Sequence, residues 1–444
     1  MKVNSPLTND KRLIGQAYTK AGELVTKFMN DNSQRNDLVT AICEKLEELG
    51  LHLTASELFL AIDRPREAVE MLCKANEWSK AKKIASELVP DMEQKVDIAY
   101  REFLKNQGRV GDLIDVDVLS AIDLLVERGQ WEKALLTAKQ QNHQPLMDKY
   151  VALYATELMN NERYLDAVKV FEQYGASANP QNFNIYKRLI DNLLNTRNAD
   201  FEVLASLRNM IFTLNVVLTK TKSDVDSRII QIFDRYQYVL HYCALERAFE
   251  STDSVDAKKL CLKIKIALLR YLDLLQPDKL FYDAGMACRE FGGEYENMAF
   301  AFLNQYLDIV DSIEENDPSL VDNSLFENTD IPTQYALPQQ MFLGTDEHED
   351  VKEHVLAISV DQRVQKELKL DERDCYEASS VDLNGKVYPI CIITGYPILH
   401  GSKELGSNMS ADQTAWQTFS TLIRTHPSDQ LFDVQSFITR WSNS

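Results

Sequence analysis

A helical spacing of apolar residues runs through most of this chain. From Lys11 to about Ile313, apolar residues recur three and four positions apart, and turn-forming residues interrupt the pattern about every 12 to 20 residues. Segments with this spacing form short amphipathic helices, and each helix must bury its apolar face against a neighbour. The sequence therefore predicts an array of short antiparallel helices over residues 1–313.

A short signature marks the second helices of several helix pairs. An aromatic residue precedes an alanine by three positions at Trp78 and Ala81, Trp131 and Ala134, and Tyr164 and Ala167, and Arg64-Pro65-Arg66-Glu67-Ala68 is a weaker copy. The aromatic ring fills the groove between neighbouring helices, and the small alanine lets two helices approach closely, as in tetratricopeptide hairpins. We therefore predict a mostly α fold with a degenerate, tetratricopeptide-like α-solenoid, which is a binding surface and not a catalytic pocket.

Negative charge is concentrated in one segment of the chain. The net charge is −20, and residues 290–351 contain 15 aspartates and glutamates but no lysine or arginine. An acidic surface repels the phosphates of nucleic acids, and no basic patch interleaved with aromatic residues is visible, so we expect no nucleic-acid partner. The acidic segment is either a solvated linker or a docking strip for a basic partner, and the sequence leaves both open.

Residues 314–347 are predicted to be an acidic, proline-containing linker. Pro318, Pro332 and Pro338 interrupt any continuous helix there. The segment is also too apolar for a simple tether, as shown by Leu325, Phe326, Ile331, Tyr335, Leu337, Met341 and Phe342. We expect part of this linker to lie along the helical array.

Several kinds of chemistry find no support in the sequence. The seven cysteines lack paired spacing, which favours reduced, buried thiols over disulfide bonds. No glycine-rich phosphate loop and no Gly-x-Ser-x-Gly motif is present, and His241 has the setting of a core histidine. We predict no catalytic residues and no cofactor. No apolar run approaches about 18 residues, so we expect a soluble intracellular protein without a transmembrane segment or a secretory signal.

The C-terminal part changes character. We predict a connecting helix over 348–371 and a small α+β module over 372–444. Residues 382–385, Asp-Leu-Asn-Gly, have the composition of a hairpin turn. Residues 410–413, Ser-Ala-Asp-Gln, match a capping box before a helix that ends near Pro427. A last helix follows, with an apolar face formed by Leu431, Val434, Phe437, Ile438 and Trp441.

The module also contains a modified zinc-finger pattern. The order Cys391-Ile392-Ile393-Thr394 stands where a RING finger has Cys-x-Ile-Cys. Threonine is not a zinc ligand, and the remaining candidates have no knuckle spacing: Cys375, Cys391, His400 and His426. We therefore expect no metal. With its order of hairpin, helix, proline loop and helix, the module resembles a U-box, a RING-shaped fold that uses no zinc.

The U-box resemblance implies a binding site for a ubiquitin-conjugating enzyme or for ubiquitin. In a U-box the first loop supplies an apolar residue and the second loop a proline, and the matching positions are Ile393, with Ile392 as the alternate, and Pro427. Strand alternation would bury one isoleucine and expose the other. No basic residue equivalent to the catalytic linchpin of a U-box is evident, although Arg424 precedes Pro427 by three positions. The alternative is a domain that only caps the helical array.

The helical hairpins, the acidic linker and the U-box-like end together resemble the C-terminal part of the WD-repeat and tetratricopeptide subunits of intraflagellar transport complex B. This resemblance implies a scaffold needed for cilium assembly and for train and cargo binding. It implies partners among the subunits of complexes B and A, and a location in the cilium or flagellum, at the basal body and in the cytoplasm. The alternative function is a weak U-box-type ubiquitin ligase that acts with a ubiquitin-conjugating enzyme.

Overall fold

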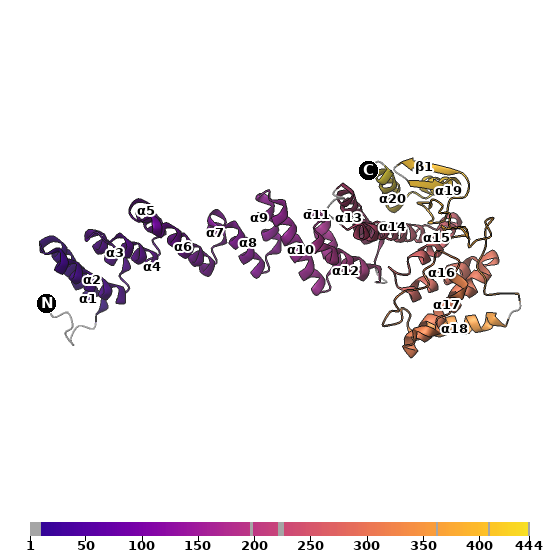
Figure 1. Cartoon of the computed structure of the whole chain (residues 1–444), viewed down its shortest axis with the longest axis horizontal. Coiled ribbons are helices and arrows are strands. Elements are labelled where there is room, and N and C mark those ends of the chain that lie inside the picture. The colour runs from indigo at the N-terminus through magenta and orange to yellow at the C-terminus, as the bar shows by residue number, and fades with distance from the viewer. Residues whose placement is uncertain (1–9, 196–198, 221–225, 361–362, 407–408, 443–444) are drawn as a thin grey trace. The chain divides into compact units, whose positions relative to one another are not determined.

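The computed structural model describes residues 10–195, 199–220, 226–360, 363–406 and 409–442. The chain forms two compact units, residues 1–147 and 148–444. Helices dominate both units (Figure 1), which confirms the prediction of a mostly α fold made of stacked helices.

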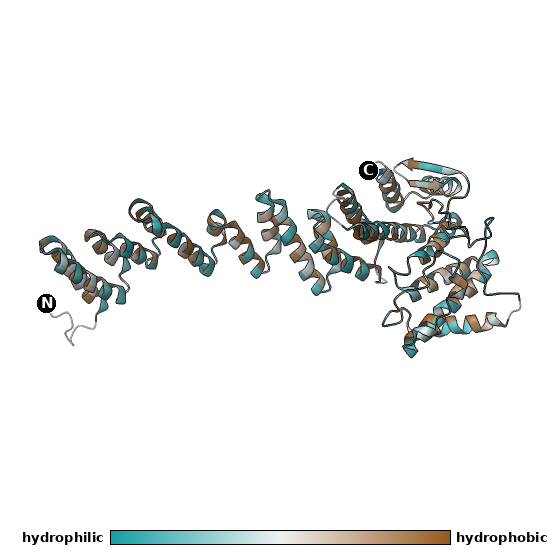
Figure 2. Cartoon of the chain, viewed as in Figure 1, coloured by the Kyte–Doolittle hydropathy of each residue, from teal (hydrophilic) through white to brown (hydrophobic). Residues whose placement is uncertain are grey.

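The first unit is a series of short helices that pack against their neighbours in the sequence. Its helices are α1 (Lys11–Phe28), α2 (Asn32–Glu48), α3 (His52–Ala61), α4 (Pro65–Lys74), α5 (Trp78–Leu88), α6 (Glu93–Gln107), α7 (Val110–Val116), α8 (Val118–Glu127) and α9 (Trp131–Gln140), with a 3-10 turn, η1 (Pro90–Met92). Each helix carries both hydrophilic and hydrophobic residues (Figure 2), and buried apolar residues of neighbouring helices form clusters. One such cluster joins Val39, Leu46 and Phe59, which are at most 5% exposed.

The same left-handed turn ends several of these helices. Asp63, Asn76 and Gly129 follow α3, α4 and α8 with φ angles of 60°, 59° and 68°. The next amide then bonds back to a carbonyl in the last helical turn, in the pairs Arg64 to Phe59, Glu77 to Leu72 and Gln130 to Leu125, at 2.9 to 3.0 Å. This arrangement satisfies carbonyl groups that a helix end leaves free and reverses the chain within a few residues. The next helix therefore begins directly after the turn.

The aromatic and alanine signature falls at the starts of helices. Trp78 and Trp131 are the first residues of α5 and α9. The ring of Trp78 lies 5.3 Å from those of Tyr100 and Phe103 on α6. The signature alanines are completely buried, with Ala81, Ala134 and Ala167 at 0% exposure. The alanines are small because neighbouring helices leave no room for a longer side chain.

We expect Ala81→Leu to lower the free energy of unfolding of the first unit by about 1–3 kcal/mol, because overpacking a filled helix interface displaces its neighbours. The control is Lys80→Leu, since the Lys80 side chain is 62% exposed on the same helix. That control should change stability by less than about 0.5 kcal/mol. Urea unfolding followed by circular dichroism measures both. Equal effects of the two changes would contradict a packed interface at Ala81.

The second unit contains longer helices and the C-terminal module. Its helices are α10 (Gln144–Asn160), α11 (Tyr164–Tyr174), α12 (Phe183–Leu194), α13 (Phe201–Lys220), α14 (Ser227–Glu250), α15 (Val255–Leu268), α16 (Pro277–Phe291), α17 (Glu296–Glu315), α18 (Thr345–Ser359), α19 (Gln413–Thr425) and α20 (Asp429–Ser442). Short 3-10 turns are η2 (Pro180–Asn182), η3 (Leu269–Tyr271), η4 (Gly293–Tyr295), η5 (Pro318–Leu320) and η6 (Ser324–Phe326). Two antiparallel strands, β1 (Ser402–Gly406) and β2 (Met409–Asp412), form the one named sheet among the described residues.

The acidic segment after α17 packs on the helices, as expected. Phe326 and Ile331 are buried, at 1% and 4% exposure. The Phe326 ring lies 5.4 Å from Phe281 on α16 and 6.5 Å from Phe302 on α17. The helix predicted over 348–371 is shorter than expected, because α18 ends at Ser359 and residues 363–370 are not helical.

Helix α13 is the one helix in the described part of the chain that is long and apolar enough to cross a membrane. Half of its most apolar stretch is buried inside the protein. It packs along α14, and its buried residues include Arg208 and Asn215. These are the features of a core helix in a helical array.

Candidate functional site

The C-terminal module combines two small hairpin-like turns, a strand pair and two helices. The predicted turn at 382–385 is present: Asp382 Oδ1 accepts from the amides of Asn384 and Lys386, at 2.9 Å each. Its arms form only an isolated antiparallel bridge between Val381 and Val387. The strand pair β1 and β2 was not predicted. Residues 410–412 belong to strand β2, so the chain reaches α19 in an extended conformation.

The helix cap predicted at Ser410 is two residues further along. Ser410 lies in β2, and Asp412 caps α19 by accepting a hydrogen bond from the Ala415 amide at 2.9 Å. Asp412 performs both roles because an N-cap residue has an extended backbone, which also suits the end of a strand. The apolar face of α19 is buried, with Phe419, Leu422 and Ile423 turned away from solvent.

The three predicted binding residues lie in different environments. Ile392 and Ile393 are 1% and 0% exposed, so the expectation that one of them faces solvent is wrong. Pro427 is exposed in the loop between α19 and α20. The structure therefore does not present these residues as one surface. Contact of a partner with either isoleucine would require the module to leave the helices that cover it.

Residues 390–397 form a turn closed by a bridge between Ile390 and Pro397, and we call it the Cys391 loop. Its backbone forms hydrogen bonds with side chains of α14 and η3. His241 Nε2 lies 3.0 Å from the Ile392 carbonyl oxygen, and Tyr242 donates its hydroxyl to the Cys391 carbonyl at 3.1 Å. Arg270 Nη1 donates to the Gly395 carbonyl at 3.0 Å. These three side chains satisfy polar backbone groups in a buried place, where an unsatisfied group costs about 1–3 kcal/mol.

A buried arginine connects α13 to the last helix. The Arg208 side chain is fully buried, and its Nη2 lies 2.7 Å from Asp433 Oδ2 on α20. Its guanidinium also lies 3.8 Å from the centre of the Phe437 ring. Burial lowers the pKa of Arg208, while Asp433 opposes this change. Sequence reasoning missed this contact, although a lone charge in the apolar run of α13 is a signal for a buried partner.

A second arginine joins the acidic segment to the module. Arg270 Nε lies 2.6 Å from Asp330 Oδ2, and its Nη2 donates to the Ala378 carbonyl at 2.6 Å. The same Asp330 oxygen accepts from the amide and the hydroxyl of Ser380, at 2.7 Å each. At least this carboxylate of the acidic segment therefore holds the fold together and is not simply solvated.

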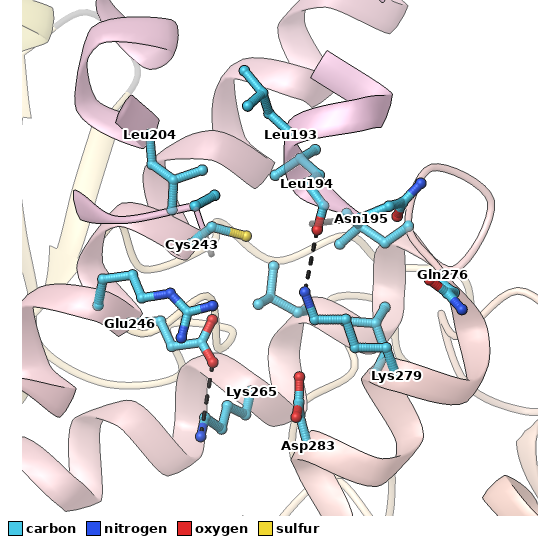
Figure 3. A pocket seen from close by; sticks show the side chains of 15 residues that line it. Leu193, Leu194, Asn195, Leu204, Cys243, Glu246, Lys265, Gln276, Lys279 and Asp283 are labelled. Atoms are coloured by element: carbon cyan, nitrogen blue, oxygen red, sulfur yellow. Dashed lines mark hydrogen bonds and ion pairs between the residues drawn. The ribbon is translucent and has the colours of Figure 1, made fainter. Parts of the chain in front are cut away.

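A small polar cavity lies between α12, α14, α15 and α16 (Figure 3). Glu246, Lys265, Lys279 and Asp283 line it, and its volume is about 40 Å³. Burial raises the pKa of Glu246 to about 7, despite the positive charge of Lys265. Perturbed carboxyl groups are common at active sites. This cavity, however, has room for water and not for an organic substrate, so we interpret it as a network that joins the helices.

The residues considered as zinc ligands do not assemble. Cys375 and Cys391 are buried, and His400 lies 2.7 Å from Glu372 on the surface. The Cys391 sulfur accepts a hydrogen bond from the Asp412 amide at 3.2 Å. Across the described ranges, no group of three or more histidine, cysteine, aspartate or glutamate side chains is placed to hold a metal ion.

Comparison with known proteins gives a consistent result. No family model matches the chain. It is 42% identical over 446 residues to intraflagellar transport protein osm-1 of Caenorhabditis elegans, which covers 100% of this chain. The chain is homologous to one part of a transport protein. The intraflagellar transport protein 172 homolog of Mus musculus is 40% identical over 97% of the chain, and intraflagellar transport protein 172 of Chlamydomonas reinhardtii is 29% identical over 95%.

The chain spans about a quarter of the length of these transport proteins, 25% of the worm protein and 24% of the mouse protein. The similarity extends over both the helical hairpins and the C-terminal module, because nearly every residue of the chain is included. The similarity is therefore not limited to a common helical repeat.

Proposed function

We propose that this chain is a protein-interaction scaffold and part of a subunit of intraflagellar transport complex B. The observation that carries this proposal is the similarity of its whole length to transport proteins at about 40% identity. The helical hairpins support it, because stacked hairpins expose extended surfaces that suit protein partners. The scaffold would bind other subunits of complexes B and A, would be needed for cilium assembly, and would act in the cilium, at the basal body and in the cytoplasm.

The test is to immobilise the full chain and incubate it with an extract of isolated cilia. We expect complex B subunits to be retained and to be released by an excess of the same chain in solution. A second arm removes the matching quarter from the homologue in ciliated cells, and shortened or absent cilia are expected. Retention of no transport subunit, together with normal cilia, would contradict the scaffold function.

We propose a second, ubiquitin-related function for residues 372–444. Three observations support it: the strand pair precedes α19, the exposed Pro427 follows α19, and α20 completes the order of elements that a U-box has. Pro427 and Arg424 are the accessible residues for such a contact, since Ile392 and Ile393 are buried. In this proposal the module binds a ubiquitin-conjugating enzyme or ubiquitin weakly.

We expect titration of the isotope-labelled full chain with ubiquitin and with a conjugating enzyme to shift amide signals around His426 and Ser428. Pro427→Ala should weaken the complex by about tenfold, which corresponds to about 1.4 kcal/mol and is typical of an interface anchor. Thr414→Ala, exposed on the first turn of α19, is the control. Absence of shifts in this loop at high partner concentration would leave the module with a capping role only.

The U-box proposal also makes a prediction about metal. Because no zinc would hold the module together, treatment with a chelator should leave its thermal unfolding midpoint unchanged, unlike a small zinc domain in which metal binding drives folding. Elemental analysis of the purified chain is the second measurement. Zinc bound in a one-to-one ratio would contradict the U-box assignment.

A further inference from the structure

A leucine-lined groove lies where the C-terminal module meets the start of α17 and the acidic segment. Its volume is about 740 Å³. Four leucines from three segments line it: Leu325, Leu368, Leu370 and Leu383. Leu370 and Leu383 are 59% and 64% exposed, and the other two are half-buried. The size is that of a pocket that takes several side chains of a ligand.

The convergence of these leucines separates the groove from ordinary surface. Single exposed leucines are common on folded proteins and need no explanation. Here Leu325 comes from η6, Leu370 from the chain before the module, and Leu383 from the tip of the module's first turn. Met298 and Tyr376, both buried, also line the groove. Apolar side chains that converge on one hollow indicate a surface that a partner covers.

The charge around the groove indicates the sign of that partner. Glu294, Glu367 and Asp374 line it, and Lys369 is the one basic residue among the described lining residues. The Lys369 ammonium is already shared, at 2.9 Å from Glu294 and 3.3 Å from Glu377. The groove therefore keeps a negative charge, which attracts lysine or arginine and repels acidic segments.

The groove walls are fixed in place before any partner arrives. Leu370 is bridged to Tyr376, and the Glu377 amide donates to the Lys369 carbonyl at 3.0 Å. Arg373 lies 2.6 Å from Asp371 in the same turn. A preorganised groove loses little conformational entropy on binding, which favours affinity.

We propose that this groove binds an amphipathic segment of a partner protein, in which leucine-like side chains are flanked by lysine or arginine. The apolar side chains of the segment would occupy the space between Leu370 and Leu383, and its basic side chains would face Glu367 and Asp374. This is the mode in which helical or extended peptides bind apolar grooves. The proposal adds a defined surface to the scaffold function but does not depend on the transport assignment.

The experiment selects peptides of about 16 residues from a random displayed library on the immobilised full chain. Enriched peptides are then synthesised with a fluorophore and titrated against wild-type protein and variants. We expect enriched sequences to carry a net positive charge and apolar residues. The double substitution Leu370→Ser with Leu383→Ser should weaken them by at least about tenfold, and Glu367→Lys by at least about threefold.

Val387→Ser is the matched control, because Val387 is 70% exposed on the same turn but does not line the groove. It should bind the selected peptides as wild type does. Unfolding midpoints of all variants should agree, since every substituted side chain is exposed or lies on the groove rim. The proposal is overturned if no peptide is enriched, if enriched peptides are acidic, or if the double substitution binds as wild type does. Sedimentation that shows a dimer abolished by the double substitution would also overturn it, because the occupant would then be a second copy of the chain.

Discussion

Gly395→Ala should lower the free energy of unfolding of the second unit by about 2–5 kcal/mol, the sum of a left-handed backbone and an overpacked contact. Gly395 has a φ of +74°, a backbone conformation that residues other than glycine rarely adopt. An added Cβ would lie 2.6 Å from the Cβ of Ala267 on α15. The substitution therefore pushes the Cys391 loop away from α15 and weakens the hydrogen bond from Arg270.

Gly385→Ala is the matched control for this effect. Gly385 has a similar φ of +79°, but no atom lies within 4 Å of the position an added Cβ would take. It should therefore show the backbone part alone, about 1–2 kcal/mol. Hydrogen exchange at the Ile392 amide, which donates to Ser410 at 3.1 Å, reports on the docked loop. If Gly395→Ala and Gly385→Ala have the same free energy of unfolding and the same hydrogen-exchange rate at the Ile392 amide, the Cys391 loop is not packed tightly against α15.

The helices were predictable because their causes are local. The helical spacing predicted up to about Ile313 corresponds to helices such as α14 (Ser227–Glu250), and the signature alanines are buried. Spacing, caps and left-handed turn residues all act within a few positions, so a single sequence contains them. The expected packing of the linker also followed from its composition. Large apolar side chains such as Phe326 and Ile331 are buried only if the linker packs on the helices.

The docking of the module was not predictable in the same way. Ile392 is bound through its carbonyl by His241, which lies 151 positions earlier in the chain. Strand alternation describes an isolated strand, but here α14 covers one side of the Cys391 loop and β2 lies along it. The isoleucines are therefore buried on both sides. Contacts of this range leave only indirect signals, such as the lone Arg208 in an apolar helix.

His241, buried where the module packs on α14, should make the second unit sensitive to acid. His241 is fully buried on α14, with the rings of Phe437 and Trp441 of α20 at 5.6 and 5.5 Å. Because a carbonyl only accepts, Nε2 carries the hydrogen that bonds Ile392, and Nδ1 has no hydrogen-bond partner among the described groups. Burial first, and the positive charge of Arg208 second, lower the pKa of His241 to about 3, although the Ile392 carbonyl opposes the change.

The sign of the pH dependence follows from this lowered pKa. An unfolded histidine titrates near about 6.5, so below that pH the unfolded chain binds a proton that the folded chain excludes. The stability is therefore complete above about pH 6.5 and falls as the pH drops toward about 3, by up to about 1.4 kcal/mol per pH unit. At about pH 4.5 the loss from this one group should reach about 2–3 kcal/mol.

We expect His241→Gln to remove this part of the acid sensitivity, because glutamine keeps an N–H donor for the Ile392 carbonyl but does not titrate. Urea unfolding of the second unit at several pH values between about 7.5 and 4.5 compares the two proteins. The wild-type free energy of unfolding should fall more steeply, by about 2–3 kcal/mol over this range, because the two proteins differ in this one titratable group. Parallel pH profiles of the wild type and His241→Gln would show that His241 is already protonated in the folded protein or is exposed to solvent. A steeper wild-type profile, with weaker protection of the Ile392 amide in acid relative to its intrinsic exchange rate at each pH, would show that a proton on this histidine releases the module from α14.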